Sequence, residues 1–144
     1  YTQNVLLTTE EVFLHRIEAY AMTGRTDLAK DDLITFINQK HIADGIGSEL
    51  SGTEIENVKP ADRERIQPFY RPLTQEQAAI LYYVSEVARQ QFIHEGLRWF
   101  DLRRFNISVD RNRVGEAKKA RYVLQPEDSR KTLSLPEGVT LINP

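Results

Sequence analysis

The sequence predicts a mainly α-helical fold made of tetratricopeptide-like helical hairpins with long irregular loops. Apolar residues recur at helical spacing in two neighbouring stretches that meet at Gly24, and a third such stretch begins after Leu73. The composition suits a single globular domain, because 40% of the 144 residues are hydrophobic and 28% are charged. We therefore expect the whole chain, residues 1–144, to form part of one domain.

The first hairpin is predicted over residues 8–40. Thr8 and Glu11 fit a capping box at the start of the first helix, and Gly24 supplies the left-handed residue that ends it. The second helix follows at once, with Thr26 or Asp27 as its cap. The apolar faces are Phe13, Ile17, Tyr20 and Ala21 on the first helix and Leu28, Ala29, Leu33, Phe36 and Ile37 on the second. This spacing has the register of a tetratricopeptide repeat.

Residues 41–72 form the predicted long loop, because three glycines and three prolines interrupt the periodicity there. A second hairpin is predicted over residues 74–105. Its first helix begins with the capping box Thr74-x-x-Gln77 and is expected to run to Gly96. The tail, residues 106–144, is predicted as irregular, with extended segments and turns at its prolines.

The stretch HEGLRWFDLRRF, residues 94–105, concentrates charged and aromatic side chains. Glu95 and Asp101 resemble the two carboxylates of a glycosidase. Their spacing, however, places them on different faces of a helix, and Arg98 and Arg104 stand at helical neighbour positions. We therefore predict ion pairs of Glu95 with Arg98, and of Asp101 with Arg98 and Arg104, and no catalytic residue.

The region after Arg98 also has a local excess of positive charge, with eight Lys or Arg and three Asp or Glu in residues 98–121. Basic grooves with interleaved aromatics bind single-stranded nucleic acid. The net charge of the chain is −2, however, and Trp99, Leu102 and Phe105 fit an apolar helical stripe. We therefore predict no nucleic-acid binding and a buried Trp99, whose replacement by alanine would cost about 3–5 kcal/mol of stability.

Other chemistry has little support in the sequence. The chain has no cysteine, and its three histidines are scattered, so we predict neither a metal site nor a cofactor. The segment QPFYRP, residues 67–72, holds Phe69 and Tyr70 between two prolines. Rigid loops that present aromatic rings suit sugar binding, although burial of the rings against the helices is the commoner arrangement. Phe69 and Tyr70 are the candidate ligand-binding residues.

Three segments resemble, in order, the C-terminal part of the SusD/RagB family of nutrient-binding proteins. EVFLHRIEAYAMTGR matches the family's E-x-Y-L-x-R-A-E-A-Y-x-x-x-G segment, EGLRWFDLRRF matches E-G-x-R-W-x-D-L-x-R, and Pro136, Asn143 and Pro144 match the closing I-P-x-x-E-I-x-x-N-P. The second segment is the most specific, and its matching residues are Glu95, Gly96, Arg98, Trp99, Asp101, Leu102 and Arg104.

The resemblance implies a non-enzymatic, mostly helical protein that binds oligosaccharides or other nutrients at the cell surface. Family members are outer-membrane lipoproteins that cap a TonB-dependent, SusC-like transporter. Their lipid anchor is N-terminal, so the resemblance places it upstream of the residues shown here. The alternative, from another class, is a tetratricopeptide-like scaffold that docks a partner protein and binds no sugar.

Overall fold

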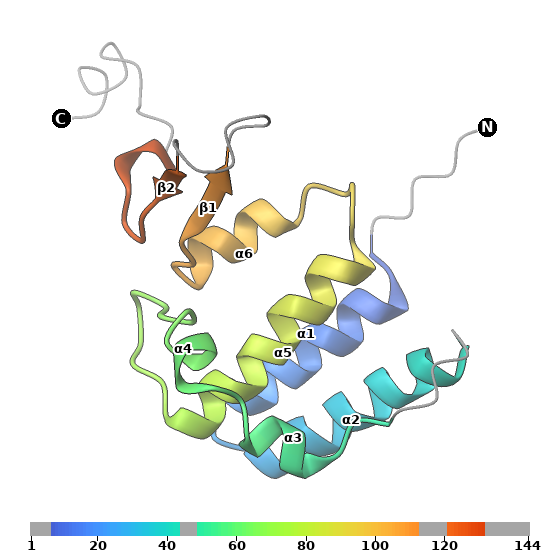
Figure 1. Ribbon diagram of the computed structural model, residues 1–144. Helices are drawn as coiled ribbons and strands as arrows, with labels where there is room; N and C mark the ends of the chain where they lie inside the picture. The colour runs from blue at the N-terminus through green and yellow to red at the C-terminus, as the bar shows by residue number, and fades with distance from the viewer. Residues whose placement is uncertain (1–6, 44–48, 113–120, 132–144) are drawn as a thin grey trace, which may run out of the picture.

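A computed structural model of the chain describes residues 7–43, 49–112 and 121–131 (Figure 1). The predicted mainly α fold is confirmed. The helices of this described part are α1 (Thr9–Met22), α2 (Thr26–Ala43), α3 (Gly52–Glu56), α4 (Pro60–Arg63), α5 (Gln75–Gln91) and α6 (Arg98–Arg104). A two-stranded hairpin, β1 (Val109–Asn112) and β2 (Arg121–Leu124), and a 3-10 turn, η1 (Ser129–Lys131), follow. The third family segment, with Pro136, Asn143 and Pro144, lies outside the described residues.

The α1 helix begins and ends where the sequence predicts. The Glu11 backbone N–H donates to the Thr8 hydroxyl at 3.1 Å, which caps the helix. At the other end Gly24 has a φ of +80°, a conformation that costs glycine little. The Arg25 N–H donates to the Tyr20 carbonyl at 2.9 Å, so the unpaired carbonyls of the last turn are satisfied by a Schellman motif.

Helices α1 and α2 pack against each other as the predicted hairpin. Ala29 is fully buried, and its small side chain allows the two backbones to approach closely. Across the same interface Arg16 donates to both carboxylate oxygens of Asp32, at 2.8 and 3.0 Å. Leu28 is an exception to the predicted apolar face, because it is 47% exposed. The tetratricopeptide register of this hairpin stays a prediction.

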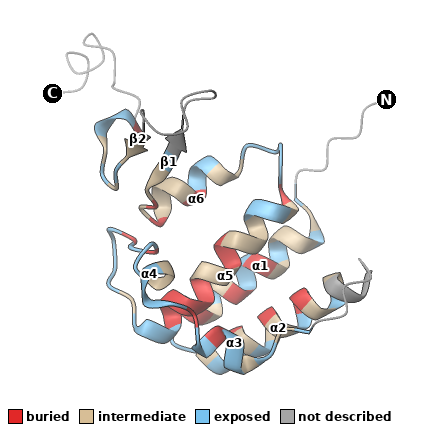
Figure 2. Cartoon of the chain, in the orientation of Figure 1, coloured by how far each residue is buried: buried red, intermediate tan, exposed pale blue. Residues whose placement is uncertain are grey.

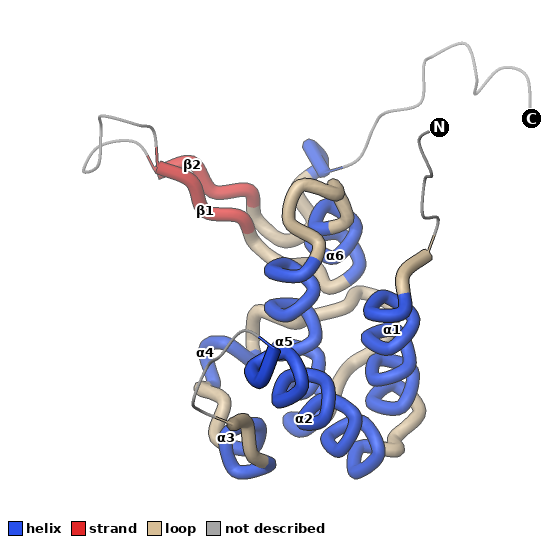
Figure 3. The backbone as a smooth tube through the Cα atoms, turned by 90° about the vertical axis from the view of Figure 1, so that its right-hand side faces the viewer, coloured by secondary structure: helices blue, strands red, loops and turns tan. Residues whose placement is uncertain are grey.

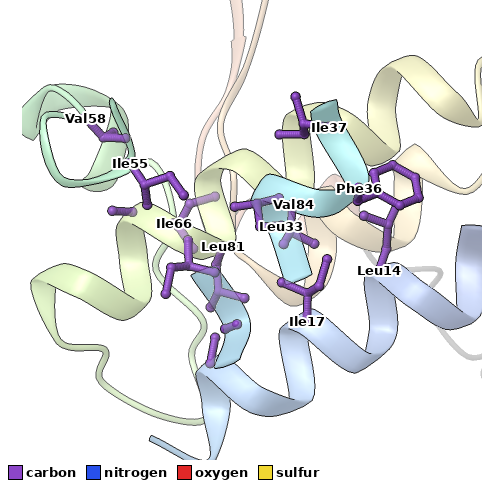
Figure 4. Close-up of a cluster of buried hydrophobic side chains, with 14 of the residues drawn as sticks. Leu14, Ile17, Leu33, Phe36, Ile37, Ile55, Val58, Ile66, Leu81 and Val84 are labelled. Atoms are coloured by element: carbon purple, nitrogen blue, oxygen red, sulfur yellow. The ribbon is translucent and has the colours of Figure 1, made fainter. Parts of the chain in front are cut away.

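The α5 helix is the centre of the domain, since it contacts α1, α2, α3, α4 and α6. It starts with the predicted capping box between Thr74 and Gln77, whose two bonds measure 2.9 and 3.2 Å. Figure 2 shows buried residues concentrated on α5 and on the faces of α1 and α2 near it. The close-up in Figure 4 shows this cluster, with Ile17 from α1, Leu33 from α2 and Val84 from α5. All three side chains are at most 2% exposed.

The segment predicted as a long loop, residues 41–72, is partly helical. α2 continues to Ala43, and α3 and α4 lie within the segment. Glu54 closes a capping box with Ser51, and Ile55, at 1% exposure, joins the core. These helices are too short to show an amphipathic period. The signals that the sequence offers for α3 are the capping residues Ser51 and Glu54 and the apolar Ile55.

The last part of the described chain leaves the helical layer. The β1–β2 hairpin extends away from the helices in Figure 3 and pairs antiparallel, with Val109 opposite Leu124. It agrees with the predicted extended segments of the tail. No helix in the described residues has the length and hydrophobicity needed to cross a membrane.

Candidate functional site: the EGLRWFDLRRF segment and the aromatic loop

The EGLRWFDLRRF segment forms a turn followed by a short helix. α5 ends at Gln91, before the predicted end at Gly96, and α6 begins at Arg98. His94 and Gly96 have φ values of +72° and +78°, so the backbone reverses through two left-handed residues. The glycine of this segment is therefore required by the turn that lets α6 fold back.

Arg98 binds α5, and this corrects both predicted ion pairs of Arg98, with Glu95 and with Asp101. Its guanidinium donates to the Ser85 hydroxyl at 2.6 Å and to the Ser85 carbonyl at 3.1 Å, and it pairs with Glu86 at 3.4 Å. Glu95, the predicted partner, is exposed because the turn carries it away from the start of α6. Burial lowers the pKa of Arg98, with the Glu86 carboxylate acting in the opposite direction. Arg98 thus fastens α6 to the middle of α5.

The predicted ion pair of Arg104 with Asp101 is confirmed, and Arg104 has a further partner in a distant segment. It donates to Asp101 at 3.0 Å within α6 and to Glu18 of α1 at 2.7 Å. Asp101 is only 8% exposed and Glu18 is also largely buried. The two most extensive family-like segments therefore meet in one ion-pair cluster, which we call the Glu18–Arg104–Asp101 cluster.

Glu18 is the member of this cluster whose hydrogen-bonding capacity is only partly satisfied. Its Oε1 accepts from Arg104, whereas its Oε2 is buried without a hydrogen-bond partner. Burial raises the pKa of Glu18, and the Arg104 guanidinium opposes this rise. A buried acceptor without a donor costs free energy unless the group takes up a proton.

Glu18→Gln should therefore change how stability depends on pH. A carboxyl whose pKa is higher in the folded protein binds more protons there than in the unfolded chain. Its contribution to stability falls as the pH rises from 4.5, the ordinary value, through the raised folded value. We expect the stability of Glu18→Gln relative to the native chain to increase over this range, measured by urea unfolding at several pH values. Parallel curves for the two proteins would contradict the assignment.

Trp99 is exposed, which contradicts its predicted place in the core stripe, and its neighbour Phe100 is exposed as well. Trp99 is 43% exposed and Phe100 is 66% exposed, whereas Phe105 is fully buried and Leu102 partly buried. The prediction was wrong because α6 has only seven residues and does not start until Arg98, so its inner face is set by Asp101 and the residues after it. Trp99→Ala is accordingly expected to have a small effect on stability.

Phe69 and Tyr70 are also exposed, at 72% and 52%. Their rings contact each other edge to face, with centroids 5.6 Å apart. The segment that carries them is fastened on both sides. The Gln67 N–H donates to the Phe105 carbonyl at 2.9 Å, and Arg71 donates to the Met22 carbonyl at 2.7 Å. The expectation that both rings pack on the helices is thus wrong, and the loop presents them to solvent.

Two hollows adjoin these residues. One is a groove between α1, α5 and α6, with an apolar floor that includes Leu14 and Val84 and with the Glu18–Arg104–Asp101 cluster at its edge. The other is a cavity of about 270 Å³ beside Phe69. Its remaining lining residues are Arg103, Asn106, Glu127, Asp128, Ser129 and Lys131. None of these six was a sequence candidate, because no motif or period links the end of α6 to the turn before η1.

Comparison of the chain with protein-family models, with curated proteins and with solved structures finds no match. The described residues also contain no group of three or more His, Cys, Asp or Glu side chains placed to hold a metal ion.

Proposed function

We propose that this chain is a glycan-binding, non-catalytic component of an outer-membrane uptake system that passes oligosaccharides to a TonB-dependent transporter. The observation that carries the proposal is the exposed Phe69–Tyr70 pair on an anchored loop. Sugar rings stack their apolar faces on such aromatics, and their hydroxyls bond to polar neighbours. A loop held at Gln67 and Arg71 presents the rings with little ordering cost on binding.

The order of the SusD/RagB-like segments supports the same proposal. Residues of the first two segments make polar contacts between different helices of the domain: Arg16 with Asp32, Arg98 with Ser85, and Arg104 with Glu18. By this resemblance, the protein sits at the cell surface through a lipid anchor. It acts by binding and handing over its ligand, with no chemical step.

Phe69→Ala and Tyr70→Ala are expected to weaken oligosaccharide binding by at least about tenfold each, as the loss of a central aromatic contact does. Titration calorimetry of the full chain against a panel of oligosaccharides measures this effect. Phe100→Ala is the matched control, because that ring is equally exposed but lies at the other hollow. Equal losses in all three variants, or none in the loop variants, would contradict the assignment of the loop.

A protein-docking scaffold is the second candidate, and one observation favours it. Ile93, Trp99 and Phe100, within eight residues at the turn and the start of α6, are all exposed, and Phe100 lines the apolar groove. Large exposed apolar side chains near one another are typical of protein interfaces. If no oligosaccharide binds, and Phe100→Ala weakens a purified complex with the transporter while Phe69→Ala does not, this second function replaces the first.

A further inference from the structure

We propose that the cavity beside Phe69 is a subsite for an acidic sugar, a glycan unit bearing a carboxylate or a sulfate. In this subsite Lys131 and Arg103 bind the anionic group while Phe69 stacks on the sugar ring. The inference rests on the proposed glycan binding and names the chemical class of the ligand. It is carried by a buried lysine that lines the cavity and is not paired with a carboxylate within hydrogen-bond distance in the described residues.

Lys131 is only 5% exposed. Its Nζ donates to the Ile107 carbonyl at 3.0 Å, and this is the one acceptor that the described residues supply. An ammonium group has three donors, so the described residues leave two of them unused. Burial lowers the pKa of Lys131, with the Asp128 carboxylate acting in the opposite direction and the Arg103 guanidinium in the same one. An anion in the cavity would give this ammonium group a directly bonded partner of opposite charge.

Arg103 lies next to Lys131 and, like it, donates a hydrogen bond to a backbone carbonyl. Its Nη1 donates to the backbone carbonyl of Lys131, a neutral acceptor. A guanidinium has five donors in a planar fork, which matches the oxygens of a carboxylate or a sulfate. Two cations thus line one small cavity, and both have donors that the described residues do not use.

The carboxylates at the cavity do not cancel this charge. Asp128 is held by Arg130 through both of its oxygens, at 2.9 and 2.6 Å, and its pKa is lowered to about 2, chiefly by these bonds. Glu127 is the remaining acidic residue of the lining, and its side chain is largely solvated. Since Arg130, which lies outside the lining, neutralises Asp128, the two cations of the lining, Arg103 and Lys131, face only the solvated Glu127 carboxylate, which leaves an excess of one positive charge.

The cavity is built before any ligand arrives. The Glu127 N–H donates to the Asn106 side chain at 2.8 Å, which joins the turn before η1 to the end of α6. Asn106 and Glu127 adopt left-handed φ values of +55° and +59°, so both turns have defined conformations. The Gln67 N–H, bonded to the Phe105 carbonyl, holds the Phe69 loop on the other side. The volume of about 270 Å³ is near the lower end of small-molecule sites.

The test compares matched ligands that differ only in charge. Oligogalacturonate and its methyl ester of the same length are titrated into the full chain, and so are sulfated and unsulfated dextran oligosaccharides. We expect the charged member of at least one pair to bind more tightly, and added salt to weaken its binding but not that of the neutral member. The pair that shows the difference identifies the anion as carboxylate or sulfate.

Lys131→Met removes the ammonium and keeps the apolar stem. It should reduce the affinity for the charged ligand by about tenfold and leave the neutral ligand almost unchanged. Lys59→Met, at an exposed lysine outside the cavity, is the control for the loss of one positive charge. Phe69→Ala should weaken both ligands. The salt dependence of the native chain remains a readout if Lys131→Met does not fold.

The outcomes separate the two proposals. If neutral oligosaccharides bind and neither charged ligand has an advantage, the acidic-sugar subsite is wrong and glycan binding stands. Equal losses for both ligands in Lys131→Met, at unchanged melting temperature, would also overturn the subsite. If no oligosaccharide of either kind binds, glycan binding itself is wrong.

Discussion

Phe105→Ala is expected to lower the free energy of unfolding by about 3–5 kcal/mol, the range for a large aromatic removed from a packed core. Phe105 has no exposed surface and is the largest fully buried side chain of the described residues. It ends α6, and its carbonyl holds the loop that carries Phe69. Urea unfolding, followed by circular dichroism, measures the change.

Trp99→Ala is the matched control, because it removes a larger ring from the same helix. Trp99 is 43% exposed, so its replacement should cost about 1 kcal/mol or less. The pair reverses the expectation from sequence, which placed Trp99 in the core. A loss for Trp99→Ala as large as that for Phe105→Ala would show that α6 packs with its other face.

Leu33→Ala should cost about 2–5 kcal/mol, as leucine truncations in cores do. Leu33 has no exposed surface and belongs to the buried cluster that contains Ile17 and Val84 (Figure 4). Its loss leaves a cavity where α1, α2 and α5 meet, and those backbones cannot all close it. Thermal or urea unfolding of the full chain gives the value.

Leu28→Ala provides the comparison within α2. Leu28 is 47% exposed, so removal of the same atoms should change the free energy of unfolding by about 0.5 kcal/mol. Alanine is also a good helix former, and the helix itself is not weakened. Similar losses at residues 28 and 33 would mean that α2 is rotated from the orientation described above.

The helical hairpin of α1 and α2 could be predicted because its signals are local. A hydroxyl at Thr8, a glycine at Gly24 and an apolar period between them specify a helix and its two ends. The same holds for the Thr74 capping box. The starts of these helices and the end of α1 agree with the structure to within a residue or two, whereas α2 runs on to Ala43 and α5 stops at Gln91, before Gly96.

The inner face of α6 could not be predicted in the same way. A helix of seven residues has too few turns for its period to define one face, and the turn at His94 and Gly96 resets the phase of the pattern. Trp99, which was expected to be buried, is therefore exposed, and Asp101 is buried in its stead. Asp101 is buried because Arg104 neutralises it, and Arg104 is held in place by a second pair with Glu18, on a helix far away in the sequence.

The cavity beside Phe69 could not be predicted for the same reason: its lining residues come from segments that are distant in the sequence. Phe69 was a candidate from the sequence because it is an aromatic residue between two prolines, whereas Arg103 and Lys131 looked like ordinary surface residues. Only the fold shows that Lys131 is buried and that it shares a cavity with Phe69. Long-range contacts of this kind leave no local pattern.

The Glu18–Arg104 ion pair also bears on the order of folding. Its two residues are 86 positions apart, so it closes one of the longest loops in the described structure. The α1–α2 turn closes over a few residues, and contacts between near neighbours form sooner than contacts that must close a long loop. We therefore expect the pair to form late in folding, after the helices have assembled. An interaction absent from the transition state slows unfolding and leaves the rate of folding unchanged. On this expectation, the Glu18–Arg104–Asp101 cluster slows unfolding and prolongs the lifetime of the native state.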